Sequence, residues 1–213
     1  MRNWPLFGLR LTTPRLELRF PGPDDLDALA DRAAEGVHDA ATMPFAFPWS
    51  DAPPAQRARS TVQFHWRCWA TWTPDDWNCG LVVVHDGTVV GTQGLMAENF
   101  GVVRQVGTGS WLGRAYHGKG IGTEMRAAVL HLAFAGLGAE DAVSSAFDDN
   151  TASLRVSDKL GYRPDGIMRH VRAGASATEH RFRLTREAWA GTERIPVEIS
   201  GLAPCLPLFG VTS

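Results

Sequence analysis

Two periodicities of apolar residues alternate along the chain and predict a mixture of strands and helices. In one, every second residue is apolar, as in a strand with one buried face; in the other, apolar residues recur every three or four positions, as on the buried face of a helix. In the first half these patterns predict, in chain order, a strand at 9–20 broken by a turn at 12–14, a helix after the turn 21–24 that ends at Gly36, and a helix from Pro53 to Trp72. The strand at 9–20 is expected at an edge of the sheet.

A tight hairpin is predicted in the middle of the chain. The apolar runs 81–85 and 89–95 flank Asp86 and Gly87, a dipeptide that favours a two-residue turn between paired strands. A further strand is predicted from Val102 to Leu112. Its glycines, at 107 and 109, weaken the strand or mark a bulge, and they let another backbone or a ligand come close.

The second half repeats the alternation of helix and strand. The predicted elements are a helix from Thr123 to about Ala135, a strand at 142–147, a short helix capped by 148–150 and ended by Gly161, and strands at 167–171 and 179–184. Beyond Gly191, Val197 and Ile199 are typical of a short strand, and the prolines and glycines predict an extended tail. These elements predict an α/β fold in which a mixed sheet carries helices on its faces.

Composition narrows the class of protein. The length of 213 residues fits one domain, so residues 1–213 are expected to form a single unit. A formal charge of −2 and a pI of about 6.4 argue against a nucleic-acid-binding surface. The three cysteines lie far apart, which predicts neither a disulfide framework nor a metal site. No leader pattern opens the chain and no apolar stretch could span a bilayer, so we expect a cytoplasmic protein without a membrane partner.

Three glycines at alternate positions, Gly118, Gly120 and Gly122, precede the helix predicted to begin at Thr123. They leave backbone amides uncovered in front of the positive end of the helix dipole, an arrangement that binds phosphate groups. Four basic residues near this turn would complement a pyrophosphate: Arg114, His117, Lys119 and Arg126.

Three other interpretations of this glycine turn are open. Gly113, Gly118 and Lys119 satisfy most of the Walker A spacing, but Gly120 stands where a Ser or Thr hydroxyl would bind magnesium. A dinucleotide-binding fingerprint would need Gly or Ala where Thr123 stands. A flexible connection without a ligand also remains open.

The turn resembles the central motif of the GCN5-related N-acetyltransferase (GNAT) superfamily, R/Q-x-x-G-x-G/A, which reads His117 to Gly122 here. The resemblance extends to the branch that acetylates the N-termini of ribosomal proteins, through Thr13–Arg19, Trp111–Leu112 and Asn150–Tyr162. It covers about 9–189, leaves 190–213 as a C-terminal extension, and implies a single mixed, mostly antiparallel sheet with helices on both faces. The two ends, Trp4–Phe7 and Pro207–Gly210, resemble an actinobacterial subgroup that includes members thought to use succinyl-CoA.

The resemblance implies which residues hold an acyl-coenzyme A. Backbone amides of the glycine turn would bind the pyrophosphate, the strand at Trp111 and Leu112 would pair with the pantetheine arm, and Asn150 would hydrogen-bond the same arm. The complete implied set is Trp111, Leu112, His117, Gly118, Lys119, Gly120, Ile121, Gly122, Thr123 and Asn150. Ser153 would be catalytic, as a proton donor to the leaving thiolate. Apart from the resemblance, Asn150 is an ordinary helix cap and Ser153 an exposed helical serine.

One position departs from the family pattern. Gly107 lies where this branch often has a glutamate that deprotonates the amine through water. A base is useful because a protonated amine cannot attack. Glu98, His117 and Tyr116 are the candidate substitutes, although an amine with a lowered pKa or a chain of waters would need none.

Residues 43–77 are expected to shape the acceptor site, because they carry a dense set of aromatic side chains: Phe45, Phe47, Trp49, Trp66, Trp69, Trp72 and Trp77. At helical spacing such a stripe is more often packing than pocket. An amine-bearing small molecule, a peptide N-terminus and a lysine side chain all remain open as acceptors. Arg104 and His170 are candidates to recognise a succinyl carboxylate.

Two functions follow. The first is a metal-free N-acyltransferase that moves an acetyl or succinyl group from coenzyme A to a primary amine by direct attack in a ternary complex. No Ser/His/Asp or Cys/His constellation suggests an acyl-enzyme. The second is a non-catalytic acyl-CoA-binding sensor or interaction domain, which Gly107 favours. A homo-oligomer is compatible with either function.

Overall fold

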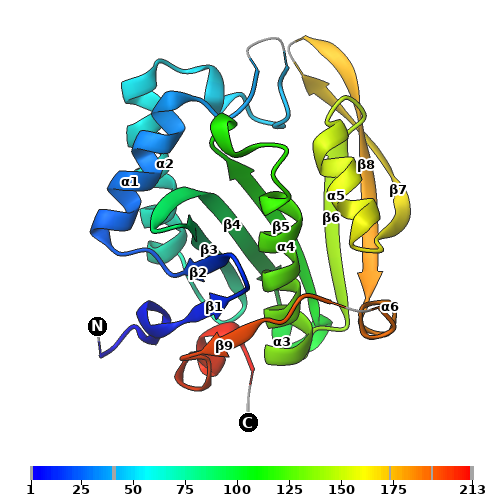
Figure 1. Cartoon of the computed structure of the whole chain (residues 1–213). Helices are drawn as coiled ribbons and strands as arrows, with labels where there is room; N and C mark the ends of the chain where they lie inside the picture. Colours follow the sequence, from blue (N-terminus) through cyan, green and yellow to red (C-terminus); the bar gives the residue numbers. More distant parts are fainter. Residues whose placement is uncertain (1, 40–41, 173, 193, 212–213) are drawn as a thin grey trace.

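The computed structural model describes residues 2–39, 42–172, 174–192 and 194–211, and this part of the chain is built around one nine-stranded sheet (Figure 1). The strands lie in the order β7-β8-β6-β5-β4-β3-β2-β1-β9. Their bounds are β1 Arg10–Thr12, β2 Leu16–Arg19, β3 Asp76–His85, β4 Thr88–Glu98, β5 Gln105–Leu112, β6 Asp141–Phe147, β7 Arg163–Arg172, β8 Ala175–Thr185 and β9 Glu198–Ser200. Every pair is antiparallel except β5–β6, which is parallel. The predicted mixed, mostly antiparallel α/β sheet is thereby confirmed.

Helices cover both faces of the sheet, as predicted (Figure 1). On one face lie α1 (Pro23–Glu35) and α2 (Pro54–Ala70); on the other lie α4 (Ile121–His131), which continues into the π-helical turn η4 (Leu132–Gly136), and α5 (Thr151–Lys159). The shorter elements are α3 (Phe100–Val103), α6 (Arg186–Ala190), and the 3-10 turns η1 (Pro5–Gly8), η2 (Trp49–Asp51), η3 (Arg114–Tyr116) and η5 (Ala203–Phe209). None of the described helices is long and apolar enough to cross a bilayer.

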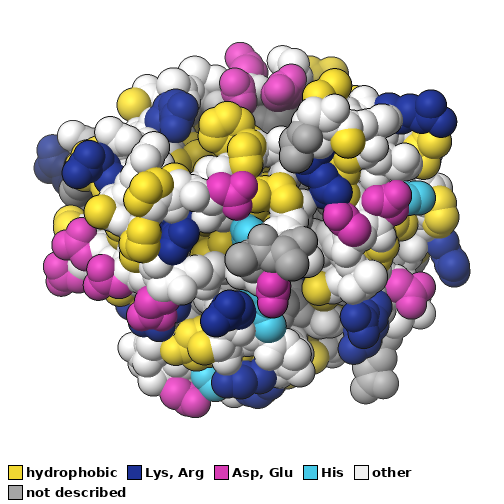
Figure 2. Space-filling view, turned by 90° about the horizontal axis from the view of Figure 1, so that it is seen from above, with side chains coloured by type: hydrophobic (Ala, Val, Ile, Leu, Met, Phe, Trp, Pro, Cys, Tyr) yellow, Lys and Arg dark blue, Asp and Glu magenta, His cyan; other side chains and the backbone are white. Residues whose placement is uncertain are grey.

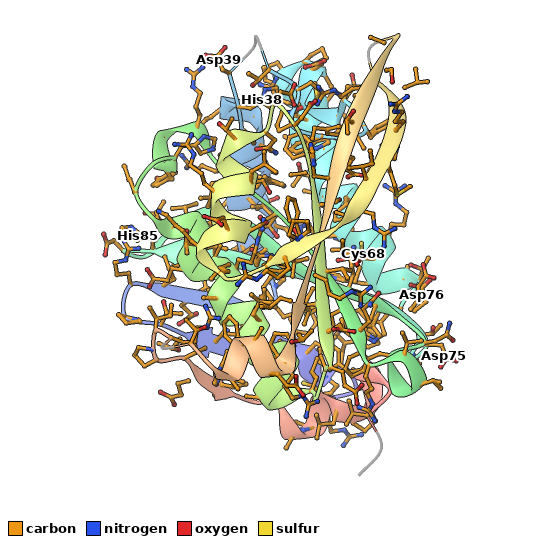
Figure 3. The ribbon with its side chains drawn as sticks, turned by 90° about the vertical axis from the view of Figure 1, so that its right-hand side faces the viewer. His38, Asp39, Cys68, Asp75, Asp76 and His85 are labelled. Atoms are coloured by element: carbon orange, nitrogen blue, oxygen red, sulfur yellow. The ribbon has the colours of Figure 1, made fainter. Side chains whose placement is uncertain are left out.

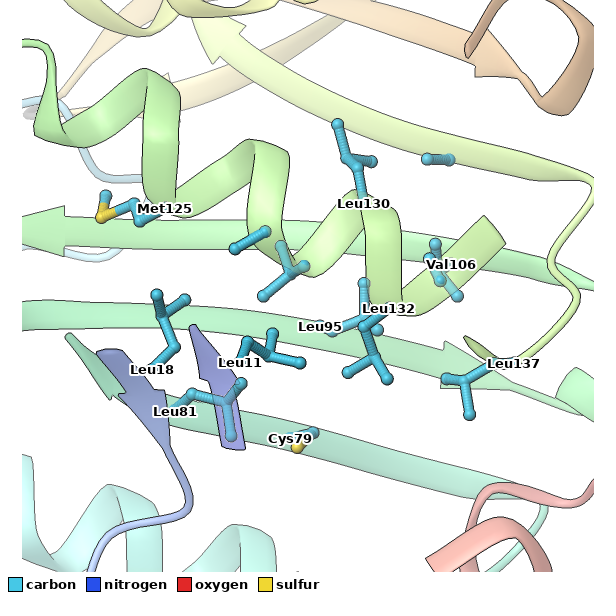
Figure 4. Close-up of a cluster of buried hydrophobic side chains, with 14 of the residues drawn as sticks. Leu11, Leu18, Cys79, Leu81, Leu95, Val106, Met125, Leu130, Leu132 and Leu137 are labelled. Atoms are coloured by element: carbon cyan, nitrogen blue, oxygen red, sulfur yellow. The ribbon is translucent and has the colours of Figure 1, made fainter. Parts of the chain in front are cut away.

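Strand alternation divides the core between the two faces. On β3, Val82 and Val84 pack with Leu29 of α1, whereas Leu81 and Val83 face the other way, into the cluster that contains α4. Figure 4 shows Leu95 of the sheet close to Leu132, where α4 continues into η4, and Leu81 beside Leu11 and Leu18. Because side chains on a strand alternate in direction, the apolar run on β3 is buried on both faces.

Several predicted boundaries need correction. Val102 and Val103 belong to α3, and β5 begins only at Gln105, after Arg104 takes a left-handed φ of 53°. α4 begins at Ile121, before the predicted start at Thr123. The hairpin strands β3 and β4 run from Asp76 to Glu98, beyond the predicted 81–95.

The first and last segments also differ from expectation. β1 is not an edge strand, because β9 pairs with it, Leu11 opposite Ile199. The predicted extended tail instead forms η5, whose Cys205 and Phe209 are fully buried in the main core. Of the predicted extension 190–213, Glu193, Thr212 and Ser213 lie outside the described residues.

Candidate active site

The parallel strands β5 and β6 separate partway along their length. They pair from Gln105 to Gly107, and the last pair is Gly107 with Val143. Beyond this point β5 continues to pair with β4 as far as Leu112. Over the described chain, the other edge of β5 from Thr108 to Leu112 therefore has no partner strand, about 14 Å of backbone at the usual rise per residue. An extended ligand can pair with such an edge.

Two helices begin at the end where these strands separate. α4 follows β5 and α5 follows β6, so both helix N-termini lie beyond the carboxyl ends of the parallel strands (Figure 1). Ligands of open α/β sheets bind in this position. Seen from this end, basic and acidic side chains are interspersed with apolar ones (Figure 2), so an anion would be held by local groups rather than by a broad basic surface.

The glycine turn leads directly into α4. Gly118 has φ +74°, and Gly120, which caps the helix, has φ +79°; both values lie in the left-handed region that glycine adopts without penalty. The turn thus presents backbone N–H groups together with the positive end of the helix. The predicted contacts Ile121, Gly122 and Thr123 form the first turn of α4.

The basic side chains near the turn do not all lie as predicted. His117 Nε2 is 3.0 Å from the carbonyl oxygen of Leu112, so the imidazole ring already contacts one hydrogen-bond acceptor of the free β5 edge. Lys119 Nζ lies 5.3 Å from the centre of the Tyr116 ring. The prediction that Arg126 complements a pyrophosphate is wrong in its geometry, because Arg126 is buried in the second turn of α4.

A second cation near the turn was missed in the sequence analysis. Glu124 is buried in the first turn of α4, and it accepts hydrogen bonds from Thr13 Oγ1 at 2.7 Å and from Arg15 Nε at 2.6 Å. Arg15 also donates from Nη1 to the carbonyl oxygen of Lys119 at 3.0 Å. The sequence distinguishes the segment 13–19 only through the family resemblance. Its contacts anchor the glycine turn and place the Arg15 guanidinium, paired with Glu124, beside it.

Asn150 and Ser153 lie together at the start of α5. The Asn150 Oδ1 atom accepts a hydrogen bond from the Ser153 backbone N–H at 3.1 Å, which makes Asn150 a helix cap. This cap orients the side chain, because its oxygen is used by the helix while its NH₂ group can donate elsewhere. The hydroxyl of Ser153 is 3.5 Å from Nη2 of Arg126, so α4 and α5 bring these groups to one place.

A polar cluster lies between α4, α5 and the separating strands. Arg126 donates to Ser157 Oγ at 3.1 Å and to Ser144 Oγ at 3.5 Å. Burial lowers the pKa of Arg126 and raises the pKa of the Tyr162 hydroxyl. Arg126 Nε is buried without a hydrogen-bond partner among the described residues, whereas the buried hydroxyls of Thr108 and Tyr162 lie close enough to interact with each other. An unpaired N–H of this kind suits a polar ligand that supplies the missing acceptor.

Two grooves open on the opposite face of the sheet. One, of about 590 Å³, is lined by Asp76, Trp77, Asn78, Met96, Ala97, Glu98, Asn99, Val103, Gln105, Val106, Gly107 and Val143. It contains Gly107 and Val143, the last pair before β5 and β6 separate. The other, of about 520 Å³, shares Asp76, Trp77 and Asn78 with it and extends along α2. Figure 3 shows Asp76 at the sheet end and Cys68 above it on the same side. An acceptor can therefore approach the point of strand separation from the face opposite α4.

The candidate bases fall into two places. Glu98 lines the same groove as Gly107, whereas Tyr116 and His117 belong to the segment just before the glycine turn. Of the three candidates, Glu98 alone lines either of the two grooves described here.

The aromatic residues of 43–77 divide between core and groove. Trp72 and Trp77 pack around Phe209 in the core, with ring centres 5.5 Å and 4.9 Å from that of Phe209. Phe47 and Phe64 line the smaller groove and are exposed. Trp72 and Trp77 therefore pack in the core, as expected for most of these aromatic residues, whereas Phe47 and Phe64 form an accessible apolar wall.

Other reactive groups give little support for different chemistry. Burial raises the pKa of the Cys68 thiol and of the Cys79 thiol, which disfavours a reactive thiolate at either position. Among the described residues, no group of three His, Cys, Asp or Glu side chains could hold a metal ion. His170 and Arg104 are the predicted candidates to bind a succinyl carboxylate. Nε2 of His170 lies within hydrogen-bonding distance of Glu179, at 2.8 Å, and Arg104 donates a hydrogen bond to the Leu137 carbonyl oxygen.

Comparison with known proteins identifies the family of this arrangement. Residues 15–163 match the family model described as an acetyltransferase (GNAT) domain. A probable N-acetyltransferase of Bacillus subtilis, YjcK, is 30% identical over 95 residues, which are 45% of this chain and 52% of that protein. The match thus spans about half the length of this curated relative.

Solved structures share the fold. Mycobacterium smegmatis RimJ, solved in complex with a CoA disulfide, superimposes with a TM-score of 0.66 at 19% identity, covering 86% of this chain and 90% of RimJ. RimL, a ribosomal alpha-N-protein acetyltransferase solved in complex with coenzyme A, gives a TM-score of 0.65 at 15% identity, covering 83% of this chain and 97% of RimL.

Proposed function

Because this chain belongs to the GNAT acetyltransferase family, whose members transfer an acyl group from coenzyme A, we propose that it transfers an acetyl group, or another short acyl group such as succinyl, to a primary amine. The observation that carries the proposal is the free edge of β5 beside the N-terminus of α4. A phosphate site that lies next to a free strand edge fits a ligand in which a pyrophosphate is followed by an extended, amide-containing arm.

The chain offers specific groups to the donor. Backbone N–H groups from Gly118 to Gly122 would hold the pyrophosphate, with Arg15 as the neighbouring cation. The N–H of Thr123 already donates to the carbonyl oxygen of Gly120 at 3.2 Å. The β5 edge around Trp111 and Leu112 would pair with the pantetheine arm, and the NH₂ group of Asn150 would donate to one of its carbonyl groups. Displacement of His117 from Leu112 would open the upper end of this edge. No metal takes part.

The acceptor would enter from the groove that contains Gly107. The thioester supplies an activated carbonyl, and the amine attacks it directly, with both substrates bound. A backbone N–H on the free β5 edge would stabilise the charge that develops on the carbonyl oxygen. Ser153 would donate a hydrogen bond from its hydroxyl to the departing sulfur. The absence of a reactive cysteine at the described positions supports direct transfer over an acyl-enzyme.

Proton removal from the amine is assigned to Glu98, acting through water. Glu98 shares the groove with Gly107 and is exposed. A carboxylate that reaches the amine through water can serve as a general base. An amine already deprotonated in solution would bypass it, so the dependence on Glu98 should be greatest for strongly basic acceptors.

Acceptors of three kinds fit the groove: an amine-bearing small molecule, a peptide N-terminus and a lysine side chain. Asp76 and Glu98 on the groove wall favour a cationic acceptor. The fold shared with RimL, an alpha-N-protein acetyltransferase, supports a protein N-terminus among these acceptors. The three cysteines are free thiols, which supports a cytoplasmic location.

A second candidate function is an acyl-CoA sensor that binds the donor without transferring the acyl group. Gly107 favours it, because no carboxylate stands at that position of the groove. Release of free thiol from acetyl-CoA and succinyl-CoA, measured across a panel of amines and peptides, separates the two functions. Acyl transfer predicts thiol release that depends on the amine, whereas CoA binding without release in every mixture would favour the sensor.

The donor site is tested by a matched pair of glycine variants. Gly120→Val should abolish CoA binding while the protein stays folded, because a β-branched residue is strained at φ +79°. Gly122→Ala should retain binding, since Gly122 is not among the positive-φ residues and its new Cβ would lie 3.8 Å from Val156 Cγ2, an ordinary contact. Unchanged CoA affinity of Gly120→Val in a thermal-shift titration would contradict the proposed donor site.

A further inference from the structure

Arg126 is a buried cation that the proposed reaction has not yet used. It lies in the second turn of α4 and is 5% exposed. A guanidinium stays protonated even when burial lowers its pKa, so a full charge is held inside the protein. Buried charges are normally paired with an opposite charge.

The groups that accept hydrogen bonds from Arg126 are neutral. They are the hydroxyls of Ser144, Ser153 and Ser157, and the described residues form no ion pair with it. The titratable group that faces it is Tyr162, which is itself buried and protonated at neutral pH because burial raises its pKa. The charge of Arg126 is therefore solvated by dipoles alone, and it would attract an anion that forms nearby.

The direction of the hydrogen bonds determines what Ser153 can do. A guanidinium has only donors, so the oxygen of Ser153 must accept. The hydroxyl proton of Ser153 is then turned away from Arg126 and is free to donate to another group. The backbone N–H of Ser153 is held by Asn150, which fixes the start of the helix that carries it.

Arg126 lies where the gap between β5 and β6 closes. Its partner Ser144 follows Val143, which forms the last β5–β6 pair with Gly107. Arg126 lies five positions after the first residue of α4, a rise of about 7.5 Å away from the glycine turn. A donor held by its pyrophosphate at the turn, with its arm along the β5 edge, would end beside this cluster.

We propose that Arg126 is a positioning residue for the acyl transfer: it holds and polarises Ser153 and provides the counter-charge for the sulfur of the departing coenzyme A. This inference rests on the proposed function. In the transfer, the amine nitrogen forms the new C–N bond, the C–S bond breaks with its electron pair on sulfur, and the nitrogen loses one proton to water or Glu98. Ser153 donates a hydrogen bond to the sulfur, and the Arg126 charge stabilises the thiolate through that bond.

The decisive readout is the thiol pKa of bound coenzyme A, followed by thiolate absorbance as the pH is raised with the wild-type protein and with Arg126→Met. A nearby opposite charge typically lowers the pKa of an acidic group by about 1 to 3 units. The bound thiol should titrate below free coenzyme A in the wild type and close to free coenzyme A in Arg126→Met. Affinity for desulfo-coenzyme A should stay within about twofold, because that molecule has no thiol to stabilise.

Further variants separate this role from simple packing. Arg126→Lys keeps the charge, so the thiol of bound coenzyme A should still titrate partly below the free thiol. Arg126→Gln keeps hydrogen-bond donors but not the charge, so the thiol should titrate close to the free thiol. This pair of variants also serves if Arg126→Met does not fold. Ser157→Ala removes a partner of Arg126 without touching Ser153, and should leave the thiol pKa close to the wild-type value. Arg126→Met and Ser153→Ala should be non-additive in kcat, because the first acts through the second.

The results that overturn the inference are distinct from those that overturn the proposed function. If wild type binds coenzyme A and its thiol titrates alike in wild type and in the uncharged Arg126 variants, Arg126 has only a structural role. Additive effects of Arg126→Met and Ser153→Ala on kcat would also reject it. If the wild-type protein fails to bind coenzyme A at all, the proposed function fails and this inference with it.

Discussion

The Cγ atom of Met96 lies 3.1 Å from the position that a Cβ atom would occupy at Gly107. The two residues face each other across β4 and β5. Met96 also has its Cε atom 3.4 Å from the corresponding position at Gly109, so one flexible side chain covers two glycines of the sheet. Met96 therefore covers this part of the proposed acceptor groove, at the position where the family resemblance implies a carboxylate base.

A base can be introduced at this position only if Met96 gives way. We expect Gly107→Glu to lower the free energy of unfolding by about 1 to 3 kcal/mol through overpacking, and Met96→Ala to relieve part of that loss in the double variant. With space restored, the double variant should show higher kcat/KM near neutral pH than Met96→Ala alone, because the new carboxylate can accept the amine proton. Urea denaturation and pH–rate profiles measure both effects. Equal profiles for the two would argue against a proton-transfer role at this position.

Glu124 is expected to be essential for the glycine turn. Glu124→Ala removes the acceptor of Thr13 and Arg15 at a buried site, which should lower the free energy of unfolding by about 2 to 4 kcal/mol. Coenzyme A affinity should fall as well, since Arg15 also anchors Lys119. The control is Glu35→Ala, which removes an exposed pair with Arg32 and should cost at most about 1 kcal/mol. Urea denaturation that gave equal losses for the two variants would contradict the anchoring role.

The C-terminal turn η5 is expected to be part of the stable core. Phe209 is fully buried between Trp72 and Trp77, and the indole N–H of Trp72 donates to the Leu208 carbonyl oxygen at 2.8 Å. Phe209→Ala should therefore destabilise the protein by about 3 to 5 kcal/mol, as for other large core aromatics. Phe47→Ala removes an exposed ring and should change stability by less than about 0.5 kcal/mol. A small effect of Phe209→Ala in chemical denaturation would show that the tail is dispensable.

Stability should fall in acid partly because of His65. This side chain on α2 is 2% exposed, and burial lowers its pKa from 6.5 to about 4. Between these values the unfolded chain binds a proton that the folded protein does not, so stability is present above pH 6.5 and is lost as the pH falls toward 4. The loss amounts to about 3 kcal/mol at 1.36 kcal/mol per unit.

Replacing His65 tests this dependence. His65→Leu should flatten the fall in the free energy of unfolding between pH 6.5 and 4, measured by urea denaturation at several pH values. Leu29→Ala is the control, since it weakens the same face of the core without a titrating group and should lower stability equally at both pH values. An unchanged acid slope in His65→Leu would show that other groups cause it.

Local sequence was sufficient for most of the helices and strands and for the position of the glycine turn. Asp86 and Gly87 mark the hairpin, Gly36 ends α1 and Asn150 caps α5, each because the required backbone conformation or hydrogen bond depends on a few neighbouring residues. The position of Gly118 and Gly120 before α4 follows in the same way. The structure of the C-terminal segment could not be predicted in this way, because burial of Phe209 depends on contacts with Trp72 and Trp77, more than 130 positions earlier in the chain.

Only the tertiary structure determined which groups line the candidate site on the two faces of the sheet. The pairing of β5 with β6 ends after Gly107, and because the two strands are distant in sequence no local pattern encodes where it ends. Arg126 was predicted as a surface ligand for phosphate because charge alone suggests exposure, yet packing of α4 against α5 and β6 buries it beside three serines. The sequence determines which side chains are present and which local backbone conformations they favour. Long-range packing determines which of these side chains are buried from solvent and which contact one another.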